Sequence, residues 1–85
     1  MCLIYYSSIT EREGCWQKSD GYLLSNDSEK LQAEIDRRPK YTADLSWEYD
    51  PIESFETSKE KMELFLSKAN DSILMIGDFD LDKYQ

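Results

Sequence analysis

The chain has 85 residues, which is enough for one domain with a single small core. It carries 18 Asp/Glu against 10 Lys/Arg, for a net charge of −8, and 40% of its residues are hydrophobic. This apolar content argues against a disordered chain, and no apolar run approaches the roughly 20 residues of a membrane-spanning helix. We therefore expect one acidic domain over residues 1–85.

The N-terminal part of the chain predicts three short strands. Residues 1–9 are apolar on both alternating faces, which is typical of a central strand. Polar residues then predict a turn before a second strand at 15–19. The dipeptide Asp20-Gly21 is typical of a tight turn, so 22–24 is expected to return as a hairpin partner.

A helix is predicted over Glu29–Arg38, after a cluster of N-cap residues at 25–28. Leu31 and Ile35 lie four positions apart and define its inner face. Pro39 disfavours a helical conformation in the residue before it, so the helix should end there.

The clearest strand pattern spans 41–49, where apolar and aromatic residues alternate with polar and acidic ones. This predicts a half-buried strand with one solvated face. That solvated side holds Asp44, Glu48 and Asp50. Because a proline follows Asp50, a turn is expected over 51–55.

The C-terminal part predicts a helix at 58–69 and a strand at 72–81. The helix has an apolar stripe at i, i+3, i+4 and i+7 spacing, formed by Met62, Phe65, Leu66 and Ala69. The strand begins apolar on both faces and ends with carboxylates on one face, those of Asp78, Asp80 and Asp82. Together the elements predict an α+β fold of order β-β-β-α-β-α-β, a small mostly antiparallel sheet with two helices packed on one face.

The acidic residues collect in the second half of the chain. Residues 1–40 hold six Lys/Arg and seven Asp/Glu, for a net charge of −1, whereas 41–85 hold four and eleven, for −7. Such a surface attracts basic partners and repels phosphates and anionic lipid. We expect the partner to be a basic protein, with no direct binding to nucleic acid or membrane.

Residue types for catalysis are scarce. The chain has no His, no CxxC and no phosphate-binding glycine motif, so we predict that it is not an enzyme and holds no cofactor or metal. Two alternatives remain open. Met-Cys-Leu-Ile resembles the opening of amidotransferases that use an N-terminal cysteine, which implies Cys2 as a nucleophile. Asp78, Asp80 and Asp82 could bind cations weakly at a strand end.

The cellular location is predicted from the cysteines and the first residues. Cys2 and Cys15 match no disulfide or zinc pattern, and the start of the chain lacks the basic segment of a secretory signal. Both observations favour a reducing, cytoplasmic environment.

The predicted partner-binding surface combines carboxylates, as acceptors for Arg and Lys, with partly exposed aromatic anchors. The carboxylates are those of Asp44, Glu48, Asp50, Asp78, Asp80 and Asp82, extended by Glu53, Glu56, Glu60 and Glu63. The aromatic residues are Trp16, Tyr22, Tyr49 and Tyr84. These carboxylates form one surface if the two acidic strands are neighbours and two weaker surfaces if they are not.

A small, acidic, cysteine-poor domain of this kind resembles phage anti-defence proteins, such as anti-CRISPR and anti-restriction proteins, and immunity proteins of nuclease toxins. The resemblance implies a non-enzymatic inhibitor that occupies a basic, nucleic-acid-binding surface of another protein by charge mimicry. The alternative is a structural or regulatory module that self-associates, and a further alternative is that the acids only keep the domain soluble. A monomer is favoured, as the inhibitor model implies.

Overall fold

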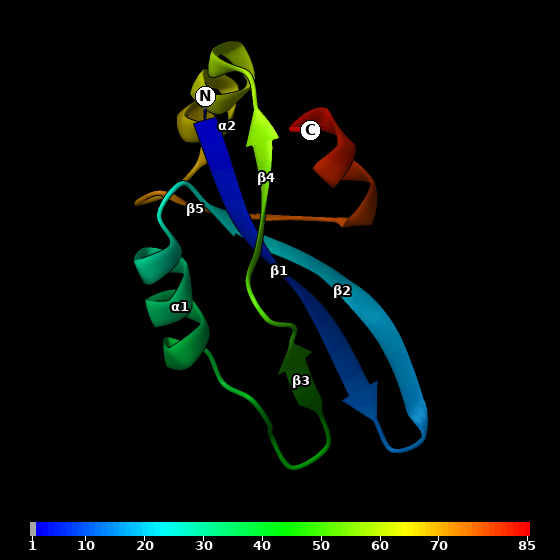
Figure 1. Cartoon of the computed structure of the whole chain (residues 1–85). Helices are drawn as coiled ribbons and strands as arrows, with labels where there is room; N and C mark the ends of the chain where they lie inside the picture. Colours follow the sequence, from blue (N-terminus) through cyan, green and yellow to red (C-terminus); the bar gives the residue numbers. More distant parts are fainter. Residues whose placement is uncertain (1) are drawn as a thin grey trace.

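The computed structural model describes residues 2–85, except the side chain of Asp78. Five strands, two α-helices and one 3₁₀-helix make up these residues (Figure 1). In chain order they are β1 (Cys2–Glu13), β2 (Trp16–Ser25), α1 (Ser28–Arg37), β3 (Ser46–Tyr49), β4 (Glu53–Thr57), α2 (Lys59–Lys68), β5 (Ile73–Ile76) and η1 (Asp78–Lys83).

The strands form one antiparallel sheet around β1. β2 pairs with one side of β1, and β5 pairs with the far side of β2. β3 and β4 follow one another along the other side of β1, so they form a single interrupted edge. β1 is thus the predicted central strand, with neighbours on both sides.

Two apolar clusters lie on opposite faces of this sheet. One contains Leu23 together with Leu31 and Ile35 of α1, and the other contains Leu24 together with Phe65 of α2. Successive residues of a strand point to opposite faces, so Leu23 and Leu24 place the helices on different sides. We call these sides the α1 face and the α2 face. The α+β class, with a mostly antiparallel sheet and two helices, is confirmed, but the placement of both helices on one face is wrong.

Local capping explains why the two helices match their predictions. The Asp27 side chain accepts hydrogen bonds from the backbone N–H groups of Glu29 and Lys30 at the start of α1. Ser58 does the same for Lys61 at the start of α2. The apolar stripe of α2 is only partly buried, because Leu66 remains 42% exposed.

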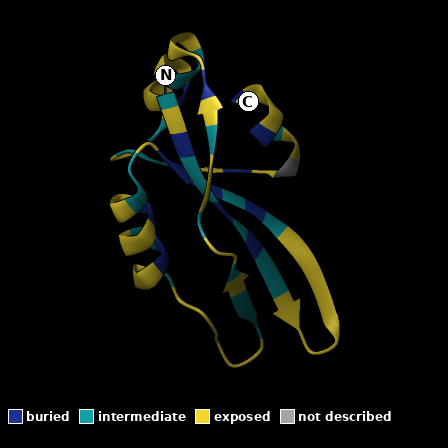
Figure 2. Cartoon of the chain, viewed as in Figure 1, coloured by how far each residue is buried: buried dark blue, intermediate teal, exposed yellow. Residues whose placement is uncertain are grey.

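The first hairpin differs from its prediction, and the element order is β-β-α-β-β-α-β instead. β2 is one continuous strand, and the expected tight turn is a β-bulge in which Asp20 is the extra residue. The reversal lies at Gly14, whose φ of 60° suits the first position of a two-residue hairpin loop. The outer part of this hairpin is exposed, whereas its inner part carries the core (Figure 2).

The expected strand at 41–49 is formed only from Ser46 onward. The backbone N–H of Thr42 donates to the carbonyl of Leu45 at 2.7 Å, and the Leu45 N–H donates to Thr42 Oγ1. This turn leaves Tyr41 78% exposed and puts Asp44 in a loop. The turn expected at 51–55 is also wrong, since most of that segment belongs to β4.

The last predicted strand ends at Ile76 and continues as the 3₁₀-helix η1. Residues three apart share a face of such a helix, and here Leu81 and Tyr84 are the buried pair. Tyr84 is 2% exposed and contacts Phe65 edge-on, so it is a core residue and not the partly exposed anchor that was predicted. The expected row of aspartates along one strand face does not exist.

Candidate functional site

Three carboxylates of the β3–β4 edge lie in a line on the α2 face of the sheet. We call Glu48, Asp50 and Glu53 the acidic row; all three residues are exposed. Each accepts a hydrogen bond from a side chain of the central strand β1. The donors are Arg12 Nη2 to Glu48 at 2.8 Å, Ser8 Oγ to Asp50, and Tyr6 Oη to Glu53 at 2.8 Å.

A bulge between β3 and β4 brings these side chains onto one face. Ile9 is paired with Tyr49 and Tyr6 with Glu53, so the edge contains one residue more than β1 over the same stretch. The extra residue reverses the order in which side chains alternate between the two faces of the sheet. Pro51 lies at this bulge, one of the few places in a sheet where proline is tolerated. Ile52 therefore packs in the α1-face cluster, while Glu53 lies beside Tyr6 on the α2 face.

The edge around the row is uniformly acidic. Residues 41–58 contain no Lys or Arg and five acids, and all five are exposed. Carboxylates two residues apart on a strand are separated by roughly 7 Å, where repulsion through water costs about 0.6 kcal/mol per pair. This cost is small enough for the fold to tolerate, and a cation bound at the row would remove it.

Within the described residues, the cation paired with the row is Arg12. Its ion pair with Glu48 is open to water, since the two side chains are 48% and 58% exposed. Arg12 also lines a shallow hollow of about 280 Å³ together with Asp44. Exposed pairs of this kind contribute between 0 and about 1 kcal/mol, so a competing cation can displace Arg12 at little cost.

Tyr6 and Ser8 hold the other two carboxylates without neutralising them. The hydrogen bond to Glu53 raises the pKa of Tyr6, with burial adding to the effect. Tyr6 thus stays a neutral donor, and the charges of Asp50 and Glu53 remain available to a partner. Tyr22 contacts the Tyr6 ring edge-on, with 6.0 Å between centroids, and limits its movement.

The remaining predicted carboxylates are spread over other parts of the molecule. Glu56 lies on the same edge but on the opposite face from Glu53, because it is three residues further along the strand. Glu60 and Glu63 lie on α2, which carries three Lys against these two acids, so the helix has a net charge of +1 and does not extend the acidic surface. Asp44 precedes β3 in the exposed loop.

The C-terminal aspartates do not join the row. Two strands, β1 and β2, separate the β3–β4 edge from β5, which leads into η1. Within η1, Asp80 pairs with Lys83 at 3.4 Å and Asp82 is exposed. The side chain of Asp78 lies outside the described residues.

The predicted aromatic anchors are also dispersed. Trp16 is 54% exposed at the tip of the first hairpin, with Lys18 Nζ 5.8 Å from its ring centroid. Tyr49 packs against the α1-face cluster with Lys40 Nζ above its ring, 4.9 Å from the centroid. Neither of these rings adjoins the row, whereas Tyr22 does through Tyr6.

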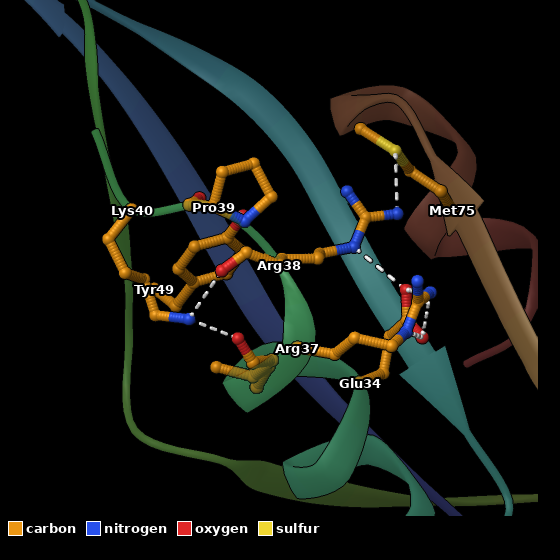
Figure 3. A network of polar contacts seen from close by, with 8 residues as sticks. Glu34, Arg37, Arg38, Pro39, Lys40, Tyr49 and Met75 are labelled. Carbon is orange, nitrogen blue, oxygen red and sulfur yellow. Dashed lines mark hydrogen bonds and ion pairs between the residues drawn. The ribbon is translucent and has the colours of Figure 1, made fainter. Parts of the chain in front are cut away.

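A second polar region lies between α1 and β5, where a groove of about 530 Å³ is lined by Arg37, Arg38 and Met75. Glu34 accepts hydrogen bonds from both guanidinium groups, at 2.6 Å from Arg37 and 3.0 Å from Arg38 (Figure 3). Hydrogen bonding to Arg37 lowers the pKa of Glu34 despite its burial. Both guanidinium groups of this groove are therefore already paired with a carboxylate of the chain itself.

Sequence reasoning missed the three donors Tyr6, Ser8 and Arg12. Tyr6 and Ser8 share a face of the strand predicted at 1–9, which was a usable signal, whereas Arg12 lay in the turn predicted after it. Their acceptors, however, lie between 36 and 47 positions away along the chain. Only the pairing of β1 with β3 and β4 brings the two sets together.

Further features of the described residues concern the requirements of metal sites, disulfides and membrane spans. They contain no group of His, Cys, Asp and Glu suited to a metal ion. Cys2 and Cys15 are both free, and Cys15 is exposed. No helix in the described part of the chain is long and apolar enough to cross a membrane. Comparison with protein-family models, with curated proteins and with solved structures found no match for this chain.

Proposed function

We propose that this protein is a non-enzymatic acidic inhibitor that binds a basic, nucleic-acid-binding surface of another protein in the cytoplasm. The observation that carries the proposal is the β3–β4 edge, where residues 41–58 present five exposed acids and no Lys or Arg. Regular carboxylates on a rigid strand can occupy Arg and Lys side chains that otherwise contact phosphates.

The spacing of charge limits what the edge imitates. From Glu48 to Glu56 four carboxylates occupy eight strand steps of about 3.3 Å, or one charge per roughly 9 Å. A DNA strand carries one phosphate per 3.4 Å of axis. The edge is thus too sparse to replace a whole duplex, and it suits a partner that presents a few separate Arg or Lys side chains.

Affinity capture from a host lysate, followed by a salt series, tests the proposal. We expect a captured protein that binds nucleic acid, whose nucleic-acid binding is inhibited by this chain, and whose capture weakens as salt rises. The triple variant Glu48→Gln/Asp50→Asn/Glu53→Gln should lose capture.

A matched control removes the same charge elsewhere on the exposed surface. The variant Glu13→Gln/Glu29→Gln/Asp36→Asn changes three exposed acids that lie outside residues 41–58. It should retain capture. Equal loss in both triple variants, or capture indifferent to salt, would show that the β3–β4 edge is not the binding surface.

A further inference from the structure

We infer that the basic partner binds by strand addition, with an extended Lys/Arg-bearing segment pairing with the outer edge of β4. This inference rests on the proposed function and specifies how the partner is recognised. It joins two features of the same edge, the carboxylates and the backbone groups of β4.

The direction of the backbone groups follows from one hydrogen bond. The N–H of Asp50 donates to the carbonyl of Ser8 at 3.0 Å, so the backbone of Ser8 points toward the β3–β4 edge. Backbone direction alternates along a strand, and Tyr6 therefore points the same way as Ser8. Its partner Glu53 must point back toward β1.

By the same alternation, every second residue of β4, beginning with the one after Glu53, directs its backbone groups away from the sheet. Ser54 and Glu56 direct their N–H and C=O groups away from β1. Both residues are exposed, and no described residue outside the sheet pairing is hydrogen-bonded to their backbone. β3 supports this assignment, since the N–H of Trp47, an outward position, donates to the carbonyl of Lys40 at 2.7 Å.

An edge with free backbone groups can pair with any extended chain, unless side chains select the partner. Glu53 and Glu56 make that selection here. Pairing with the β4 edge of a second copy would bring like charges together, which destabilises a strand pair. A segment with Lys or Arg at two positions three apart places one cation beside Glu53 on the α2 face and one beside Glu56 on the α1 face.

The test uses synthetic peptides and the whole chain at low salt. The probe is a blocked peptide of Thr and Val with two Arg three positions apart. Its companions are the same peptide with Glu in place of Arg and the same peptide N-methylated at alternate amides. We expect the Arg peptide to slow hydrogen exchange at the amides of Ser54 and Glu56, and the Glu peptide not to bind. N-methylation should weaken binding about tenfold or more, because it removes backbone hydrogen bonds without altering charge.

A variant of the protein gives a second readout. Ser54→Pro removes an outward N–H and keeps the pairing with β1, as prolines on sheet edges do. It should weaken binding of the Arg peptide by about threefold to tenfold, whereas Ser54→Thr should not.

The outcomes separate strand addition from binding by charge alone. If the N-methylated peptide binds as tightly as its parent, strand addition is wrong and the proposed function stands. If the Arg peptide does not bind at all, strand addition is wrong as well. The proposed function is decided independently by the captured partner and the triple variant of the acidic row.

Discussion

The two edges of the sheet are protected in different ways. At β5, Ile73 exchanges both backbone hydrogen bonds with Asn70, at 2.8 and 3.0 Å, and Arg38 Nη2 lies 3.9 Å from the sulfur of Met75 (Figure 3). The chain itself thus pairs the backbone at the first residue of this apolar edge. At β4 the outward N–H and C=O groups of Ser54 have no partner among the described residues, and the exposed carboxylates of Glu53 and Glu56 lie on either side of them. A residue paired with its own chain offers no backbone groups to any partner, whereas exposed acids repel only partners of the same sign.

The largest effect on stability is expected from Gly21→Ala, which disturbs the packing of β2 against β5. Gly21 has a φ of 109°, and a Cβ there would collide with the backbone carbonyl of Ile76. We expect a loss of about 2–4 kcal/mol in the free energy of unfolding, measured by urea denaturation. Gly77→Ala is the control, since its Cβ would meet nothing within 4 Å. Equal stability of the two variants would show that β5 does not depend on this close approach.

A smaller loss is expected from Glu34→Gln at the groove beside β5. The variant loses the charge that holds Arg37 and Arg38, which should cost about 1 kcal/mol at neutral pH. The folded pKa of Glu34 lies below its ordinary 4.5, so this stabilisation is present above pH 4.5 and is lost as pH falls through the folded value. Urea denaturation at pH 7 and pH 3 should show the difference from wild type shrinking in acid.

The control for Glu34→Gln is Asp36→Asn on the same helix, where the carboxylate accepts a hydrogen bond from Gln32. It should change stability by less than Glu34→Gln at pH 7. A difference between Glu34→Gln and wild type that is the same at both pH values would argue against the ion-pair network.

A gain in stability is expected from Ser72→Gly in the turn that leads into β5. Asp71 and Ser72 have φ values of 53° and 68°, a left-handed conformation that suits glycine. Relief of this cost, less the added entropy of the unfolded chain, should stabilise the fold by about 0.5 kcal/mol. Ser67→Gly inside α2 should have the opposite sign. Thermal denaturation of both variants measures this contrast, and a loss of stability in Ser72→Gly would refute it.

The smallest effect on stability is expected at the charged edge, from Glu53→Gln. Its carboxylate is exposed, so unfolding free energy should change by no more than about 0.5 kcal/mol. The pKa of Tyr6 should fall toward its ordinary 10.0, because the carboxylate raises it in wild type. The Tyr6–Glu53 contribution is present below pH 10 and is lost as pH rises through the raised pKa of Tyr6.

Spectrophotometric titration of the tyrosines checks this shift, with Tyr6→Phe identifying the transition that belongs to Tyr6. An unchanged titration in Glu53→Gln would mean that the hydrogen bond does not persist in solution.

Local signals in the sequence predicted the helices well. Asp27 and Ser58 cap α1 and α2 within a few residues of the expected starts, because capping depends only on neighbouring residues. Alternation was less reliable. It extended a strand through 41–45, where the Thr42 hydroxyl instead stabilises a turn. It also extended β5 past Ile76, where the chain instead forms η1 and buries Leu81 and Tyr84.

The sequence predicted which side of the strand two carboxylates of the acidic row occupy, but not how the other predicted carboxylates are arranged. Glu48 and Asp50 were placed correctly on one side of their strand, because two residues separate them within a regular pattern. Glu53 was predicted only to extend the surface, and its side of the sheet could not be predicted, since that side depends on a bulge that forms against β1. The sequence left open whether the aspartates of the C-terminal segment lie beside them, and the strand order keeps the two groups apart.

The bulge before β4 determines how the chain would respond to an insertion or a deletion at this point. It determines which face of the sheet each side chain from 53 to 57 lies on, so deletion of Ile52 would move every side chain of β4 to the opposite face. The side chain of Glu56 would lie on the α2 face, where Phe55 now packs against the apolar cluster, and Phe55 would lie on the α1 face. We therefore expect an insertion or deletion at this point to disrupt the fold more than a substitution does, although the segment lies at the surface.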